Sequence, residues 1–270
     1  MLIESLHIYP IKSVAGIALE RSTVENRGLA HDRRFLLIDD NGQFITGRQQ
    51  PDLVLVSAQS RDDGWQIDAP QMSPLRLTPP PVDAPTVALR IWRDDVSGTP
   101  VSREADEWFS DYLGASCRLV FQHATAQRLV QPAHGTQPTD VVSYADGYPV
   151  LLIGSASLND LNRRLKMPVA MSRFRTNLVA ATDEAFAEDR WRRIRIGEIE
   201  FDVVKRCARC VFTTVDPLSG QRDAAGEPLA TLRSYRLDKQ ERGVMFGVNL
   251  VPRGDGTIEA GAPIEVLSSD

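Results

Sequence analysis

The chain has 270 residues, of which 42% are hydrophobic and 25% are charged, and its formal net charge at pH 7 is −5. These values are typical of a globular protein with room for one large or two modest domains. The negative net charge argues against a general nucleic-acid or anionic-membrane surface, although 31 Lys and Arg residues leave material for a local basic pocket.

Targeting and disulfide signals are missing from the sequence. The first residues show no basic segment followed by an apolar one, and no apolar run approaches the ~18 to 20 residues of a membrane span. Three cysteines are an odd number, which disfavours a disulfide framework. We therefore expect a cytoplasmic protein with reduced thiols, no membrane segment and no nucleic-acid partner.

Strands dominate the expected elements of the first sixty residues. The first lies in LIESLHIYPI, which alternates loosely between apolar and polar residues. The segment RRFLLIDDNGQFITGRQ predicts a hairpin with strands at Phe35–Ile38 and Phe44–Thr46, joined by a turn at 40–42. A further strand is expected at Leu53–Gln59.

A proline-rich stretch and a short helix follow. The prolines between 69 and 89 indicate a loop or a sheet edge, and 87–98 returns to a strand pattern. A helix is predicted at about 106–113, with Gly114 as its stop. Its apolar face holds Trp108, Phe109, Tyr112 and Leu113.

The C-terminal half begins with a long polar stretch. Residues 123–147 lack a clear period, which predicts a loop of the kind that often serves function. A strand and a helix are expected in 148–166, where Ser157 and Asp160 fit a capping box. A second helix is predicted in EPLATLRSYR, and strands fill the remainder. The class expected is therefore mainly β with a few helices (α+β), in two parts rich in β-barrel structure, because strands and helices do not alternate regularly.

Two of the three cysteines, Cys207 and Cys210, form a C-x-x-C pair in KRCARCVFTTVDP. A structural zinc site needs four ligands, and a second pair or suitably spaced histidines are missing. A thioredoxin-type pair begins a helix, whereas a strand-like run follows here. Two small buried residues at a strand end are a third possibility. Cys117 is a possible further ligand, but its context, GASCRLVF, favours the core.

Basic residues crowd the same stretch. Lys205, Arg206 and Arg209 favour the thiolate form of a cysteine and attract anions. A thiolate beside basic side chains suggests a metal that is held within an anionic cofactor, in preference to a bare ion.

Several motifs together carry a family resemblance. RCARCVFTTVDPLSG, EPLATLRSYR and the upstream SRFRTNLV resemble a MOSC domain. YPIKSVAG, HDRRFLLID and FITGRQQPDLVLV resemble the β-barrel domain that precedes it. In this order the motifs resemble the mitochondrial amidoxime-reducing component and its bacterial relatives. The resemblance implies a MOSC N-terminal β-barrel domain over 1–122 and a MOSC β-barrel domain over 123–270.

The resemblance implies the molybdenum cofactor, a molybdenum ion on a pyranopterin, with Cys210 as the metal ligand and catalytic residue. Lys12 and Ser13 match positions that contact the phosphate end of the cofactor, and Arg33 matches a further basic contact. Cys207 is expected to support the loop without binding the metal.

Further positions match the other side of the cofactor. Arg175 and Asn177 of FRTN match residues of the MOSC domain that hold it. Asp146 matches an acidic position near the metal or pterin and is a second catalytic candidate. Thr46 and Arg48 are expected as neighbours in the cofactor site.

The activity implied is that of an oxidoreductase that reduces N-hydroxylated compounds, independent of pyridoxal phosphate. An oxygen would pass from a small substrate to the reduced metal, with protons from solvent or Asp146. Electrons would come from a separate flavin or iron–sulfur protein, because no cysteine follows Cys210 to hold a cluster.

Two alternatives stay open. A sulfur-carrier or cofactor-binding MOSC module without reductase activity would carry a persulfide on Cys207 or Cys210. A degenerate member would fold without any cofactor, and the joint presence of Lys12, Arg33, Arg175, Asn177 and Cys210 counts against it.

Overall fold

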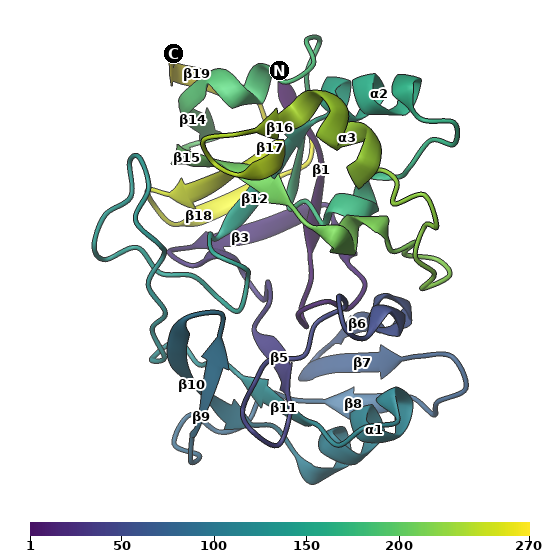
Figure 1. Cartoon of the computed structure of the whole chain (residues 1–270). Helices are drawn as coiled ribbons and strands as arrows, with labels where there is room; N and C mark the ends of the chain where they lie inside the picture. Colours follow the sequence, from purple (N-terminus) through teal and green to yellow (C-terminus); the bar gives the residue numbers. More distant parts are fainter.

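The computed structural model describes residues 1–270, and its largest element is a nine-stranded sheet (Figure 1). The main path runs β19-β14-β15-β17-β12-β13-β1-β2, with β16 paired to β17, and all its pairs are antiparallel except β12 with β13. The strands are β1 (Leu2–Ile8), β2 (Ile17–Leu19), β12 (Val150–Gly154), β13 (Leu178–Ala181), β14 (Trp191–Ile196), β15 (Ile199–Arg209), β16 (Leu237–Asp238), β17 (Gly243–Pro252) and β19 (Ile264–Ser269).

Three smaller sheets complete the β structure. One has the order β5 (Phe35–Ile38), β11 (Arg118–Phe121), β10 (Asp94–Pro100) and β9 (Val87–Ile91). The others are β18 (Gly256–Glu259), β3 (Arg21–Glu25) and β4 (Gly28–Leu29), and β6 (Ser57–Arg61), β7 (Gly64–Asp68) and β8 (Leu75–Leu77). The expected class, mainly β with a few helices, is confirmed.

Three α-helices and four 3-10 helices join the strands. They are α1 (Arg103–Leu113), α2 (Ser155–Arg164), α3 (Leu229–Arg236), η1 (Pro51–Leu55), η2 (Met171–Phe174), η3 (Ala187–Arg190) and η4 (Val211–Thr214). The prediction of α1 is confirmed, with Gly114 as a left-handed C-cap at φ 63°. No helix combines the length and apolar character that a membrane crossing requires.

The chain forms two lobes that the N-terminal segment connects. Figure 1 shows the large sheet with α2 and α3 in the upper lobe, and β5 to β11 with α1 in the lower lobe. β1 leads the chain out of the large sheet, so the predicted boundary at 122/123 does not separate the strands of that sheet from the N-terminal segment. The domain division itself stays a prediction.

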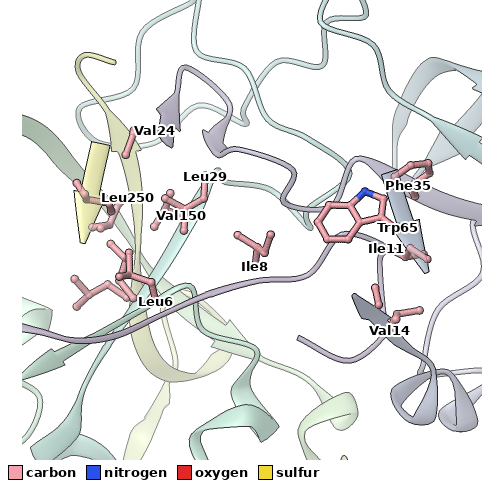
Figure 2. Close-up of a cluster of buried hydrophobic side chains, with 14 of the residues drawn as sticks. Leu6, Ile8, Ile11, Val14, Val24, Leu29, Phe35, Trp65, Val150 and Leu250 are labelled. Carbon is pink, nitrogen blue, oxygen red and sulfur yellow. The ribbon is translucent and has the colours of Figure 1, made fainter. Parts of the chain in front are cut away.

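One continuous core links the lobes. Figure 2 shows Ile8 between Leu6 and Val150 of the large sheet and Trp65 of the lower lobe, with Ile11 and Val14 on the side of Trp65 and Phe35. Ile8, Ile11 and Val14 are at most 2% exposed and belong to the same cluster of 36 buried residues. The two lobes are therefore packed around shared apolar side chains, which fixes any site between them.

Three local predictions are wrong. The second hairpin strand is reduced to a single bridge between Ile38 and Phe44, because the chain turns at Thr46 instead of continuing the ladder. Residues 51–55 form η1, for which Pro51 at the first helical position was the missed signal. The run after Cys210 is η4, not a strand.

The capping box at Ser157 is also wrong. α2 starts two residues earlier, and the Ser157 hydroxyl donates to Oε1 of Glu188 at 2.7 Å. The N–H of Gly154 donates to the same oxygen at 3.0 Å. Glu188 of η3 therefore accepts the hydrogen bonds at the start of α2. Its side chain is fully buried, and its Oε2 has no hydrogen-bond partner.

We expect Glu188→Gln to stabilise the protein at pH 8 and not at pH 4. Burial raises the pKa of Glu188, more than its hydrogen bonds from Gly154 and Ser157 lower it. The folded state thus holds the proton more tightly than the unfolded chain. The stabilisation that comes from this tighter proton binding is complete below the pKa of Glu188 in the unfolded chain, near 4.5. It is lost as the pH rises through the pKa in the folded state. Urea unfolding at both pH values measures the difference, and equal stabilities at pH 8 would contradict the expectation.

Candidate functional site

A cavity of about 310 Å³ brings together all nine residues that the sequence singled out. It lies where the segment from Lys12 to Arg48 meets the loop around Asp146, η2, the end of β15 and η4. Its lining includes Lys12, Ser13, Arg33, Thr46, Arg48, Asp146, Arg175, Asn177 and Cys210. The shared location is a finding, whereas the role of each residue stays a prediction.

The cavity is strongly basic within an acidic protein. Its lining contains eight Lys and Arg residues and a single carboxylate, that of Asp146. Five of the cations are paired with acids, in the pairs Lys12–Asp146, Arg33–Asp32, Arg173–Asp216, Lys205–Glu241 and Arg206–Asp238. Arg48, Arg175 and Arg209 form no salt bridge, so these three supply the uncompensated charge that an anion would meet.

Two of the basic residues expected to attract an anion are therefore engaged elsewhere. Lys205 Nζ lies 2.9 Å from Glu241 Oε2, and Arg206 donates to Asp238. Asp238 ends β16 and Glu241 lies in the turn between β16 and β17, a segment that the sequence did not place beside β15. Of the three cations near the cysteines, only Arg209 is left without an acidic partner.

The Lys12–Asp146 pair forms one wall of the cavity. Lys12 Nζ donates to Asp146 Oδ1 at 2.6 Å and to the carbonyl of Tyr144 at 2.8 Å. Burial lowers the pKa of Lys12 to about 8, against the opposing effect of Asp146. The Asp146 side chain is 64% exposed, and the nearby Lys12, Arg48 and Arg33 together hold its pKa well below its usual range. At neutral pH the proton of the pair thus resides on Lys12.

Arg128 holds the backbone of this wall. Its side chain is buried and donates to the carbonyls of Ser143 (3.2 Å), Ala145 (2.5 Å) and Asp146 (3.0 Å). Its Nε donates to Asp94 at 2.8 Å. The polar loop 123–147, which contains no helix or strand as predicted, is thereby fixed in place at the end that carries Asp146.

Tyr9 lies between two arginines of the opposite wall. The Cζ atoms of Arg33 and Arg175 lie 4.3 and 4.2 Å from the centroid of its ring. Arg33 donates to Asp32 Oδ2 at 2.6 Å, to Asn177 Oδ1 at 3.0 Å and to the carbonyl of Arg175 at 2.9 Å. These contacts join the N-terminal segment to η2 and β13, so the wall is shared between the two halves of the sequence.

The side chain of Asn177 makes most of its possible hydrogen bonds within the protein. Its Oδ1 accepts from Arg33 and from the N–H of Leu151, and its Nδ2 donates to the carbonyl of His7 at 3.0 Å. Its place in the cavity is therefore that of a residue that orients Arg33.

Backbone conformations that are rare for side-chain-bearing residues gather here. Ser13, Arg33 and Arg175 have φ values of 71°, 48° and 54°. Such left-handed positions each cost free energy, of order 1–3 kcal/mol at the strained sites where they persist, and they cluster at functional sites. Their joint presence in one cavity indicates a geometry that is kept for binding.

The two cysteines differ in their surroundings. Cys207 Sγ accepts from Arg209 Nη1 at 3.0 Å. Cys210 has a free thiol and is the N-cap of η4, and its carbonyl accepts from N and Oγ1 of Thr213 (3.1 and 2.9 Å). The chain from Cys207 to Cys210 is extended. Three extended residues span about 10 Å, whereas disulfide-linked Cα atoms lie within about 7 Å, so the pair does not have the geometry of a thioredoxin motif.

A bare metal ion lacks ligands in this cavity. No group of three or more His, Cys, Asp and Glu side chains is placed to hold one. Cys117 is buried beside Ser110 of α1, away from the cavity. The zinc interpretation therefore finds no ligand set.

The donors that remain suit an anionic group. Arg175 Nη2 and Arg209 Nε are buried atoms without any hydrogen-bond partner in the protein. Burial lowers the pKa of Arg175 to about 10, and the nearby positive charge of Arg33 adds to the effect. An anion beside Arg175 would therefore offset both the cost of burying its charge and its repulsion by Arg33. Unpaired guanidinium donors next to a free thiol fit a phosphate-bearing pterin whose metal takes a sulfur ligand.

The comparisons with known proteins agree with the motifs. The model of the MOSC N-terminal beta barrel domain matches residues 1–116, and that of the MOSC domain matches 139–265. Mitochondrial amidoxime-reducing component 1 of Mus musculus is 36% identical, over 98% of this chain and 82% of that protein. The same protein of Danio rerio is 34% identical, over 97% and 84%.

The chain belongs to the amidoxime-reducing component family. Among solved structures, the YUAD protein from Bacillus subtilis aligns over 97% of this chain and 93% of its own, with 9% identity and a TM-score of 0.41.

Several cavity residues of this family member were not singled out from the sequence. Arg173 and Phe212 line the cavity, whereas Tyr9 packs against Arg33 and Arg175, and Arg128 holds the backbone near Asp146 from behind the lining. None of the four carries a spacing signal, because their roles arise from contacts between distant segments. One signal was available in ITGRQ, where Gly47 lies among the predicted site residues. The ring of Phe212 packs directly on it, and an added Cβ would lie 2.1 Å from Cε2 of that ring.

Gly47→Ala is expected to destabilise the protein by about 1–3 kcal/mol, the usual cost of overpacking, because Phe212 must leave its place. Gly254→Ala is the matched control, since a Cβ there meets nothing within 4 Å and neither glycine has a positive φ. Urea denaturation of the two variants measures the difference. Equal midpoints would show that Phe212 is not confined by Gly47.

Proposed function

We propose that this chain is a molybdenum-cofactor oxidoreductase that reduces N-hydroxylated compounds with electrons from a separate flavin or iron–sulfur protein. The observation that carries the proposal is the position of Cys210, a free thiol in a cavity whose uncompensated charge comes from three arginines. The family gives the proposal its direction, because the relatives are named for the reduction of amidoximes.

Each part of the cavity has a task in this proposal. Cys210 would bind the metal, and Arg48, Arg175 and Arg209 would hold the anionic parts of the cofactor, with Ser13 and Thr46 beside them. When bound, the cofactor supplies the two-electron couple that removes the oxygen of the N–O group. The overall conversion of an amidoxime to an amidine consumes two electrons and two protons and releases one water.

The Lys12–Asp146 pair would hold a proton for this conversion. Asp146 stays ionised because of its three cationic neighbours, so it orients Lys12 and does not itself donate. Lys12, whose pKa is lowered to about 8, carries the proton near neutral pH. This assigns the acid role to Lys12, in place of the solvent or Asp146 expected from the resemblance.

The test is reduction of benzamidoxime by protein that carries the cofactor, with reduced viologen as an artificial electron source. Formation of benzamidine at a rate that depends on enzyme concentration is the expected result. A fully loaded protein that leaves benzamidoxime and other N-hydroxylated compounds unchanged would contradict the proposal.

A sulfur-carrier function is the second candidate. The observation in its favour is the 3.0 Å hydrogen bond from Arg209 to Cys207, which would stabilise a negatively charged sulfur there. Cyanide-releasable sulfur that is lost in Cys207→Ala, in protein without molybdenum, would support this function over the reductase.

A further inference from the structure

A second cavity of about 210 Å³ adjoins the first. Arg173, Arg175 and Phe212 line both cavities, so the two cavities meet at these three side chains. Phe212 follows Cys210 by two residues in η4. The second cavity therefore lies beside the wall that carries the thiol.

The second cavity has a different chemical character. Its lining includes Tyr9, Val54, Val215, Pro217 and Leu218, and it contains no acid. Arg173 is neutralised by Asp216 at 2.8 Å, and burial lowers the pKa of His7, which keeps that imidazole neutral at pH 7. The flat face of Arg175 lies over Tyr9 and Phe212, at 4.2 and 5.6 Å. Apart from Arg175, whose charge the proposed function assigns to the cofactor, these walls carry no uncompensated charge, so they favour an apolar, uncharged group.

The size and the rim support the same occupant. Apolar cavities of about 150 Å³ take up benzene, so 210 Å³ accommodates one six-membered ring with a small substituent. Leu218 at the rim is 90% exposed, held there by hydrogen bonds from its own N–H and that of Ser219 to Asp216 Oδ1. Leu218 therefore adds accessible apolar surface at the edge of the cavity.

We propose that this cavity, bounded by Phe212, Arg175, Val215 and Leu218, is a specificity subsite that binds an uncharged apolar substituent of the substrate, about one aromatic ring in size. The inference rests on the proposed function for the identity of the ligand. The subsite itself belongs to the protein and is present without the cofactor, so its binding is measurable on cofactor-free protein.

The test variant is Ser172→Phe, which introduces a ring into the cavity from an exposed position of η2. Ser60→Phe in β6 is the matched control, because Ser60 is also exposed and lies outside the cavity. Ligand-observed NMR on the cofactor-free proteins compares benzamidoxime with acetamidoxime, which lacks the ring. Benzamidoxime is expected to bind the wild type and Ser60→Phe, and to bind Ser172→Phe at least about tenfold more weakly, a loss of roughly 1.4 kcal/mol.

The loaded enzymes supply a second readout. Ser172→Phe should raise KM for benzamidoxime at least about tenfold, with kcat/KM for acetamidoxime unchanged. Equal effects on both substrates, or none on either, would overturn the subsite even if the wild type reduces both. Ring-dependent binding to cofactor-free protein that Ser172→Phe abolishes, in a protein without reductase activity, would support the subsite and refute the proposed function.

Discussion

Cys210→Ala is expected to abolish reduction of N-hydroxylated compounds while leaving the fold intact. Cys210 is only partly buried at the end of β15 and its thiol makes no hydrogen bond in the protein, so removal of the sulfur leaves packing and secondary structure unchanged. Loss of groups that merely orient a metal ligand costs 10–100-fold, so loss of the ligand itself should exceed about 100-fold. The rate of benzamidine formation measures the effect.

Cys207→Ala is the matched control for this prediction. Cys207 lines the same cavity, three residues away, and accepts its hydrogen bond from Arg209. We expect this variant to keep most of its activity. If Cys210→Ala retained activity at full cofactor loading, or if Cys207→Ala lost as much, the assignment of the metal ligand would be wrong.

Arg33→Met is expected to lower the free energy of unfolding by about 3–5 kcal/mol, the usual cost of leaving a buried charge without its partner. The Asp32 side chain is 1% exposed and that of Arg33 is 11% exposed, and their ion pair has a length of 2.6 Å. The substitution also removes the hydrogen bonds from Arg33 to Asn177 and to the carbonyl of Arg175. Urea denaturation measures the loss.

The double variant Asp32→Asn/Arg33→Met separates the two causes. Removing both charges should recover a large part of the stability, because the unpaired carboxylate is then absent. The hydrogen bonds from Arg33 to Asn177 and to the carbonyl of Arg175 stay lost in this variant. A double variant as unstable as Arg33→Met would show that the contacts with Asn177 and Arg175 dominate instead.

The fold class followed from local patterns, and the residues gathered around the cavity followed from motifs that resemble a known family. The C-x-x-C stretch, FRTN and YPIKS could be recognised because each is a short continuous motif, and the structure gathers them around one cavity. Helix α1 could be predicted because its apolar residues recur at helical spacing within Arg103–Leu113, and its stop, Gly114, follows directly.

The pairing of charges could not be predicted in the same way. Whether Lys205 and Arg206 are available to an anion depends on Glu241 and Asp238, which reach them only through the register of β15 with β17. Arg128 appears in the sequence as one polar residue of a long loop, and only its burial reveals that it holds the backbone near Asp146. Such roles arise from tertiary contacts and leave no trace in spacing or composition.

The most direct test of the account is the molybdenum and pterin content of protein expressed in a host with an intact cofactor pathway. Elemental analysis and the fluorescence of the oxidised pterin should give close to one of each per chain, with the metal lost in Cys210→Ala and kept in Cys207→Ala. Protein without molybdenum or pterin, from a host that loads another molybdoenzyme, would contradict the account.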